Sequence, residues 1–247
     1  MNIEYEIKNQ SYYRQRKGIS YMVTTNQIIK KKNARKKFEF FGPHNIDILF
    51  GIFGSLLGDS FAKKRSGKCF IRLKQASSNQ EYLFAVHHSL SSGGYCSELK
   101  PKEIIQIGKN NKAFFYRQVT TYSFASFNWL HEAFYQDGIK RIPRRELLEV
   151  FLTSLALARW ICDDGTAATS GGVIICTHCF SIEDISMICE FLNDKYGLRA
   201  NPQKAALSKD GKQQYKLYIW KQSIPILITI AAPFMVSSML RKLHVKP

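Results

Sequence analysis

Residues 157–165 read LARWICDDG, an apolar, helix-like run that ends in two adjacent aspartates and a glycine. Residues 52–60 read IFGSLLGDS and end similarly, with Asp59 lying 164 − 59 = 105 residues before Asp164. Aspartate is a poor helix-interior residue, because its short side chain competes for backbone hydrogen bonds. Both runs also carry small residues that let two helices approach closely. If the two helices pack side by side, Asp59 and Asp164 emerge at the same end.

Two carboxylates this close together predict a metal site. They cannot both stay ionised without a cation between them, and Mg²⁺ is a hard ion that carboxylates and waters bind. The chain carries 36 Lys and Arg against 19 Asp and Glu, a net charge of +17, which favours a polyanionic partner such as nucleic acid. Acids beside a basic surface suit metal-assisted phosphodiester hydrolysis. The alternative is that each acid caps a turn or pairs with a local lysine.

The hydrophobic pattern predicts the same order of elements twice. Expected helices cover residues 46–58, 79–90 and 124–135, with strands at 69–75 and 113–122 between them. The second half predicts helices at 147–162, 181–195 and 224–232, with strands at 172–180 and 213–220. A basic pair follows each acid at a similar distance, Lys140 at 140 − 59 = 81 and Lys242 at 242 − 164 = 78 residues. The repeat predicts two similar lobes, 45–143 and 144–247, related by a pseudo-twofold axis.

Residues 1–44 are predicted to form a basic N-terminal extension. They hold clusters at 14–17, 30–32 and 35–37 but no sustained apolar period. Such a segment either becomes ordered on a partner or is a solvated tail without a role.

No membrane anchor is expected, and the thiols are expected to be structural. The most apolar run, 224–236, is too short for a span and is interrupted by Pro225 and Pro233. The chain has six cysteines. Cys176-Thr-His-Cys179 superficially suggests a zinc knuckle, but the sequence offers no convincing second pair. We therefore predict that the thiols are small core residues in a reducing compartment.

The two acidic motifs resemble those of the single-chain LAGLIDADG homing endonucleases. The second is similar to the branch typified by the yeast mitochondrial omega-intron endonuclease, and segments 68–83, 139–143 and 174–196 are similar as well. The resemblance covers about residues 45–247, although Ser60 replaces a usual glycine. It implies an α+β fold of two αββαββα lobes, pseudo-twofold related, whose saddle-shaped antiparallel sheets lie on double-stranded DNA. It also implies a monomer.

The resemblance assigns roles to the site residues. Asp59 and Asp164 match the catalytic, metal-binding acids, and Lys140 and Lys242 match the basic residues near the scissile phosphates. Gly58, Ser60 and Asp163 complete the predicted metal site, with Asp163 at a position that is not usually a direct ligand. The implied cofactor is Mg²⁺, with Mn²⁺ or Ca²⁺ able to replace it for binding.

The resemblance also implies the reaction. A long target site would be cut in both strands with a stagger, leaving 3′ overhangs. The location implied is mitochondrial, with the chloroplast as the alternative.

Solvent-facing strand residues are predicted to read base edges in the major groove. Basic loops are predicted to contact phosphates, which position the protein without specifying sequence. The base-reading candidates are Arg72, Lys74, Gln75, Arg117, Gln118, Thr177, Gln203, Lys204, Gln214 and Lys216, and the phosphate candidates are Lys63, Lys64, Arg65 and residues 209–212.

The main alternative function is that of an RNA maturase, a splicing cofactor with the same fold. The basic segment 1–44 would suit intron RNA as well as DNA. Retention of both acids and both lysines favours the nuclease. A third possibility, a regulatory DNA-binding protein, predicts the loss of at least one acid, and neither is lost.

Overall fold

The computed structural model describes residues 10–16, 19–25 and 44–245. Strands β1 (Gln10–Arg16) and β2 (Ile19–Thr25) pair antiparallel within the segment that was expected only as a basic extension. The rest of that extension, including the clusters at 30–32 and 35–37, lies outside the described residues.

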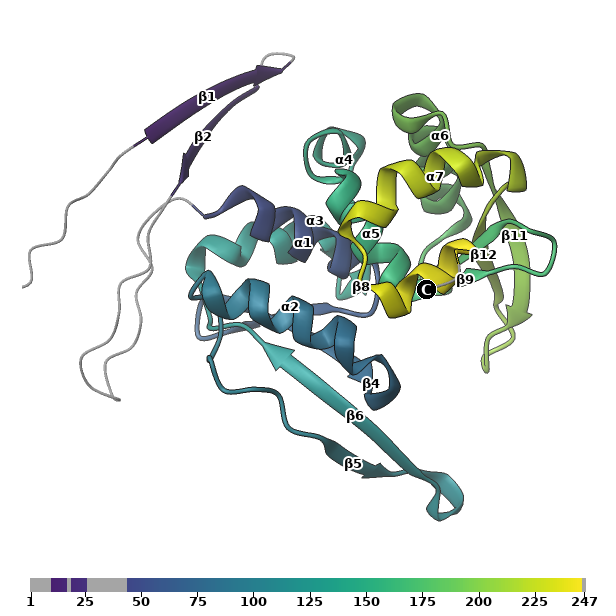
Figure 1. Ribbon diagram of the computed structural model, residues 1–247, viewed down its shortest axis with the longest axis horizontal. Coiled ribbons are helices and arrows are strands. Elements are labelled where there is room, and N and C mark those ends of the chain that lie inside the picture. The colour runs from purple at the N-terminus through teal and green to yellow at the C-terminus, as the bar shows by residue number, and fades with distance from the viewer. Residues whose placement is uncertain (1–9, 17–18, 26–43, 246–247) are drawn as a thin grey trace, which may run out of the picture.

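The remaining chain forms two lobes with the same order of elements (Figure 1). Lobe 1 consists of α1 (Ile46–Leu57), β3 (Phe61–Arg65), β4 (Lys68–Ala76), α2 (Gln80–Ser92), β5 (Ile104–Ile107), β6 (Ala113–Thr120) and α3 (Asn128–Phe134). Lobe 2 consists of α5 (Ser154–Asp164), β9 (Gly165–Ala167), β10 (Val173–Cys176), α6 (Ile182–Tyr196), β11 (Ala200–Leu207), β12 (Gln213–Ile219) and α7 (Ile224–Ala231). The sheet orders β3-β4-β6-β5 and β9-β10-β12-β11 are equivalent, so the prediction of two αββαββα lobes is confirmed. The residue boundaries 45–143 and 144–247 stay a prediction.

Three further pieces connect and complete the lobes. A short hairpin, β7 (Tyr135–Gln136) and β8 (Ile139–Lys140), follows lobe 1. Helix α4 (Arg145–Phe151) precedes α5, and a 3₁₀ helix at Ser237–Leu243 ends the described chain. The hairpin and the 3₁₀ helix matter because each supplies one of the two site lysines.

Helices α1 and α5 pack against each other through small residues. A Cβ atom added to Gly54 would overlap the backbone carbonyl group of Ala156. Gly58 lies equally close to the neighbouring helix, since an added Cβ would sit 2.5 Å from Asp163 Cβ. The glycines therefore set the separation of the two helices. The buried residues of α1 and α5 belong to one hydrophobic core that extends into both lobes.

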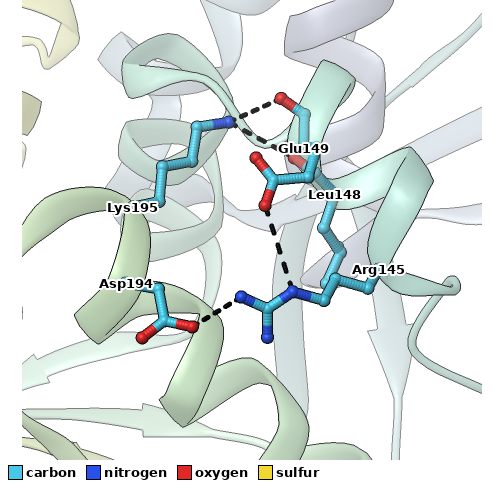
Figure 2. A network of polar contacts seen from close by, with 5 residues as sticks. All are labelled: Arg145, Leu148, Glu149, Asp194 and Lys195. Atoms are coloured by element: carbon cyan, nitrogen blue, oxygen red, sulfur yellow. Dashed lines mark hydrogen bonds and ion pairs between the residues drawn. The ribbon is translucent and has the colours of Figure 1, made fainter. Parts of the chain in front are cut away.

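The single helix expected at 147–162 is wrong, because the chain forms two helices with a break at Leu152 and Thr153. Thr153 starts α5, its hydroxyl accepting a hydrogen bond from the Ala156 amide. Carbonyl groups at the end of α4 accept hydrogen bonds from α6, where Lys195 Nζ donates to the carbonyl oxygens of Leu148 and Glu149 (3.4 and 2.8 Å; Figure 2).

Helices α4 and α6 are also joined by charge. The Arg145 guanidinium lies 2.6 Å from the Asp194 carboxylate and also approaches Glu149 (4.0 Å), as Figure 2 shows. These groups are about half exposed, so we expect the ion pairs to add little to the free energy of unfolding.

The helices cover one face of each sheet and leave the other open. In β4 the side chains of Ile71 and Leu73 are buried, whereas Arg72 and Lys74 lie on the opposite face. Residues paired across antiparallel strands share a face, so the register defines both faces of each sheet. We call the faces that carry Arg72 in lobe 1 and Lys216 in lobe 2 the open faces.

Four of the six cysteines are core residues as predicted. Cys69, Cys96, Cys162 and Cys189 are buried, but Cys176 and Cys179 are exposed. The prediction for these two is wrong because Cys176 ends β10 opposite Lys216, and Cys179 lies in the turn that follows, where the predicted strand would have continued to residue 180.

The most apolar run of the chain forms the short helix α7. Ile224, Leu227 and Ala231 are its buried residues, and Pro225 occupies its first turn, where a missing N–H costs nothing. Among the described helices, none is long and apolar enough to cross a membrane.

We expect Gly54→Ala to lower the free energy of unfolding by about 1–3 kcal/mol, because the new methyl group must push the Ala156 backbone away. Gly51→Ala is the matched control in the same helix. There the nearest atom to an added Cβ is Arg159 Nε at 3.9 Å, so helix propensity alone raises stability by up to about 1 kcal/mol. Urea unfolding of both variants measures the difference, and equal stabilities would contradict a glycine-limited crossing.

Candidate functional site

The two acids at the helix ends meet. Asp59 follows the α1 cap residue Gly58, and Asp164 is the last residue of α5. Their carboxyl groups lie close enough to interact electrostatically. Burial and the neighbouring Asp59 charge raise the pKa of Asp164 to about 7, against the opposing effect of Lys140 and Lys242. The two carboxylates repel each other when both are ionised, and a cation bound between them would offset that repulsion. The pair is therefore a candidate cation site.

A third acid, Asp163, lies beneath this pair and points into the protein. It is 8% exposed, and its Oδ1 accepts hydrogen bonds from the Tyr82 hydroxyl (2.8 Å) and the Gln75 amide (3.1 Å). Its Oδ2 is buried without a hydrogen-bond partner among the described residues. Burial, followed by the Asp59 charge, raises the pKa of Asp163 well above its usual range. The expectation that Asp163 belongs to the metal site is therefore corrected, since its Oδ1 is bound by Tyr82 and Gln75 and the described residues place no group of three acids to hold a metal.

Gln75 joins the two lobes at the site. Its Nε2 donates to Asp59 Oδ2 (2.9 Å) as well as to Asp163, and its Oε1 accepts from Asn79 Nδ2 (3.2 Å). The prediction that Gln75 reads bases is wrong, because it is 4% exposed on the helix-covered face of β4. One amide thus holds an acid from each helix and fixes the orientation of Asp59.

The two site lysines bind the carboxyl ends of the crossing helices. Lys140 Nζ donates to the carbonyl oxygens of Gly58 (2.7 Å) and Ser60 (3.2 Å). Lys242 is buried, and its Nζ donates to the carbonyl groups of residues 161, 162 and 163 (3.3, 2.6 and 3.2 Å). A cation at a helix C-terminus offsets the helix dipole. Burial lowers the pKa of both lysines, and the nearby acids oppose that shift.

Gly58 and Ser60 were predicted to complete the metal site, but the structure gives them other contacts. The Gly58 carbonyl oxygen is bound by Lys140, and the glycine itself makes room for Asp163. The Ser60 hydroxyl is buried and lines a cavity of about 90 Å³ between lobe 1 and helix α5, and it has no hydrogen-bond partner among the described residues. The Gly58 carbonyl oxygen and the Ser60 hydroxyl are thus placed for other contacts, and Asp59 and Asp164 remain as the predicted metal ligands.

These two acids suit Mg²⁺ in particular. Within residues 44–245 and the described part of the N-terminal segment, no group of three or more His, Cys, Asp or Glu residues is placed to bind a metal. Mg²⁺ is typically held by one or two carboxylates, with waters and substrate phosphates completing its shell. A like-charged carboxyl pair that carries a raised pKa matches that donor set.

Sequence reasoning missed three residues beside the acids. Tyr82 carried no signal, because it fits the apolar pattern of α2. Cys176 and Cys179 lie near Asp164, whose charge adds to burial in raising the pKa of both thiols. Residues 176–179, CTHC, resemble part of a zinc motif in the sequence. Their position beside the acid pair follows only from the fold.

The register sorts the predicted nucleic-acid contacts into two groups. Those on the open faces are Lys63, Arg65, Arg72, Lys74, Gln118, Gln203, Gln214 and Lys216. Lys63, Lys64 and Arg65 belong to strand β3 and not to the predicted loop.

Four further candidates do not lie on an open face, and for these the prediction is wrong. Lys64 faces helix α3 and pairs with Glu132 (2.9 Å), and Arg117 contacts the Pro101 carbonyl and Glu103. Thr177 is fully buried and donates to the Tyr215 carbonyl, and Lys204 shares the helix-covered face with Tyr215.

The sequence profile of the LAGLIDADG DNA endonuclease family matches residues 51–227. The chain belongs to this family. Similar proteins include the cytochrome b mRNA maturase bI2 of Saccharomyces cerevisiae, 35% identical over 96% of this chain, and that of Debaryomyces hansenii, 32% identical over 91%. This LAGLIDADG chain spans 55% of the length of the first relative and 83% of the second. The intron-encoded endonuclease ai4 of Dictyostelium discoideum is 33% identical over 65% of this chain and 99% of its own length.

The fold of this LAGLIDADG protein is also that of a solved structure. The homing endonuclease I-WcaI, bound to its DNA recognition sequence, superposes with a TM-score of 0.72. The match covers 84% of this chain and 89% of the other, at 17% sequence identity. The likeness shows the fold, while the family rests on the sequence match.

We expect Tyr82→Phe to lower the free energy of unfolding by about 1–3 kcal/mol, because it removes a donor to the buried Asp163 carboxyl group without changing shape. Tyr116→Phe, on the open face of β6, is the control and changes stability by less than about 0.5 kcal/mol. Chemical denaturation measures the free energy of unfolding of both variants. Equal losses would show that the Tyr82 hydroxyl stabilises the protein no more than an exposed tyrosine hydroxyl does.

Proposed function

We propose that this protein is a site-specific homing endonuclease that cuts both strands of a long DNA target with a stagger, leaving 3′ overhangs. The observation that carries the proposal is the contact between Asp59 and Asp164, at the crossing of two helices and between two sheets with open faces. Family membership supports nuclease chemistry in general.

The residues divide the work in the following way. Asp59 and Asp164 would hold Mg²⁺, which would supply Lewis-acid stabilisation of the charged phosphate. Gln75 keeps the Asp59 carboxylate in one orientation, and Asp163 anchors Gln75 in turn. Lys140 and Lys242 add positive charge close to each acid, where negative charge develops on the substrate.

Both acids come from one chain, which supports a monomeric enzyme. The open face of lobe 1 is basic, and we propose that it lies on duplex DNA with phosphate contacts from Lys63 and Arg65. The proposed location is mitochondrial, since two relatives are named for cytochrome b mRNA, with the chloroplast as the alternative.

An RNA maturase is the second candidate function. It is favoured by two relatives that are named mRNA maturases and that align with nine-tenths or more of this chain. The two functions are compatible in one protein, because the acid pair is needed only for cleavage.

One experiment separates the candidates. The purified protein is incubated with duplex DNA that joins the exons flanking its reading frame, with Mg²⁺ or with a chelator, and separately with the intron transcript. Staggered, Mg²⁺-dependent cuts support the endonuclease. Intact DNA together with faster splicing of the transcript supports a maturase alone, and DNA binding with neither activity supports a regulatory protein.

We expect Asp164→Asn to abolish double-strand cleavage and to leave DNA binding intact. Its stability at pH 8 should equal or exceed that of the wild type. The folded-state pKa of Asp164 is raised to about 7, so the ionised form destabilises the metal-free protein as pH rises through that value. Asp210→Asn, in an exposed turn of lobe 2, is the control and keeps full cleavage. Cutting of both strands by the Asp164 variant would refute the role of this acid.

Two adjacent lysines of β3 test the open face. Lys63→Ala should weaken duplex DNA binding for all sequences and reduce the salt dependence by about one ion, because Lys63 lies on the open face. Lys64→Ala should leave binding unchanged, because Lys64 faces Glu132 on helix α3. Fluorescence anisotropy at several salt concentrations measures both, and equal losses would refute the assignment of the faces.

A further inference from the structure

The open face of lobe 1 carries aromatic rings among its basic side chains. The register places Phe61, Phe70, Phe114 and Tyr116 on this face together with Arg72 and Lys74. Phe61 is 37% exposed and Phe114 is 49% exposed, although aromatic rings are more commonly buried. Figure 1 shows the β5–β6 hairpin, which carries Phe114, projecting away from the helices. Phe61 and Phe114 are therefore available to a partner, and Phe70 and Tyr116 are half-buried beside them.

Each ring is paired with a cation. Arg72 lies 5.5–5.6 Å from the centroids of Phe61 and Phe70, and Lys74 Nζ lies 3.6 Å from that of Tyr116. Lys112 Nζ lies 5.5 Å from the Phe114 ring. Hydrogen bonds from Arg72 to Thr120 and from Lys74 to Gln106 hold these cations in place. No acidic residue occurs in strands β3 to β6.

This combination is more specific than a basic surface. Duplex DNA presents base edges in its grooves, and its base faces are hidden in the stack. Exposed rings interleaved with cations match unpaired nucleotides, whose bases stack on aromatic side chains while the cations contact phosphates. Gln118, opposite Lys74 on the same face, adds an amide able to bind a 2′-hydroxyl group.

Lobe 2 lacks the feature. The strands of its sheet contain only two aromatic residues, Tyr215 and Tyr218. Tyr215 lies on the helix-covered face, and Tyr218 is 8% exposed with its hydroxyl group bonded to Ser170. The lobes share topology but differ in the chemistry of their open faces, so a duplex held equally by both lobes does not account for the rings.

We propose that the open face of lobe 1 is a stacking platform for unpaired RNA. The proposal deepens the second function above and rests on it for the choice of RNA, since two relatives are named for mRNA maturation. Phe114 and Tyr116 stack on bases, and the neighbouring cations bind the phosphates between them.

The test uses two adjacent phenylalanines with the same exposure on opposite faces of β6. Phe114 is 49% exposed on the open face, and Phe115 is 48% exposed on the other. Leucine keeps apolar bulk but cannot stack. Anisotropy measures the affinity of Phe114→Leu, Phe115→Leu and the wild-type chain for a labelled single-stranded RNA, for a DNA strand of the same sequence and for duplex DNA.

We expect Phe114→Leu to weaken RNA binding about tenfold, the loss of one stacked base, and to weaken duplex binding less. Phe115→Leu should bind all three probes as the wild type does, and the DNA strand should bind more weakly than RNA. Equal RNA affinities of the two variants would overturn the platform. An equal loss of RNA and duplex affinity, or DNA strand binding as tight as RNA binding, would overturn the assignment to unpaired RNA.

A splicing assay separates this proposal from the proposed function. Wild-type splicing activity combined with equal RNA affinities of the two variants would remove the platform and keep the maturase. No splicing activity combined with a selective loss in Phe114→Leu would keep the platform and remove the maturase.

Discussion

The close crossing of helices α1 and α5 is the constraint on which the rest of the structure depends. It requires a glycine wherever the neighbouring backbone or side chain would collide, as at Gly54 and Gly58. Because the helices lie side by side with their carboxyl ends together, two acids are forced together and the pKa of one rises to about 7. The crossing thus holds two like charges close together, a form of local cost that is typical of functional sites.

The positive groups around the crossing reduce that cost in two ways. Lys140 and Lys242 each bind the end of one crossing helix, where the backbone carbonyl groups lack intrahelical partners. Their charges also lower the pKa of Asp164 against the effect of burial. Both lysines come from short elements that follow a complete lobe, so each lobe has the end of its crossing helix closed by a residue from outside its αββαββα unit.

The sequence predicts the elements better than it predicts the faces. The helix at 46–58 and the repeat order are confirmed, because apolar spacing and the acidic ends are local signals. Strand β3 was missed, since FAKKR buries only Ala62 and shows no alternation. The break at Leu152–Thr153 was missed because apolar residues continue through it, and α6 supplies the donors that permit it. Gln75 is in phase with Ile71 and Leu73, a signal for its buried position that its polarity obscured.

The two halves of the site are unequal, and the inequality follows from one position in the repeat. Gln75 lies five residues before α2, and Thr177 lies five residues before α6. Both are buried, but only Gln75 is long enough to reach an acid, whereas the Thr177 hydroxyl bonds to the Tyr215 backbone. Asp59 is therefore held by a side chain of its own lobe, whereas the equivalent residue of lobe 2 does not bind Asp164. The helix crossing constrains the acid that each lobe contributes. Positions on the sheets are not constrained in this way, and it is on the sheets that the two lobes also differ in aromatic content.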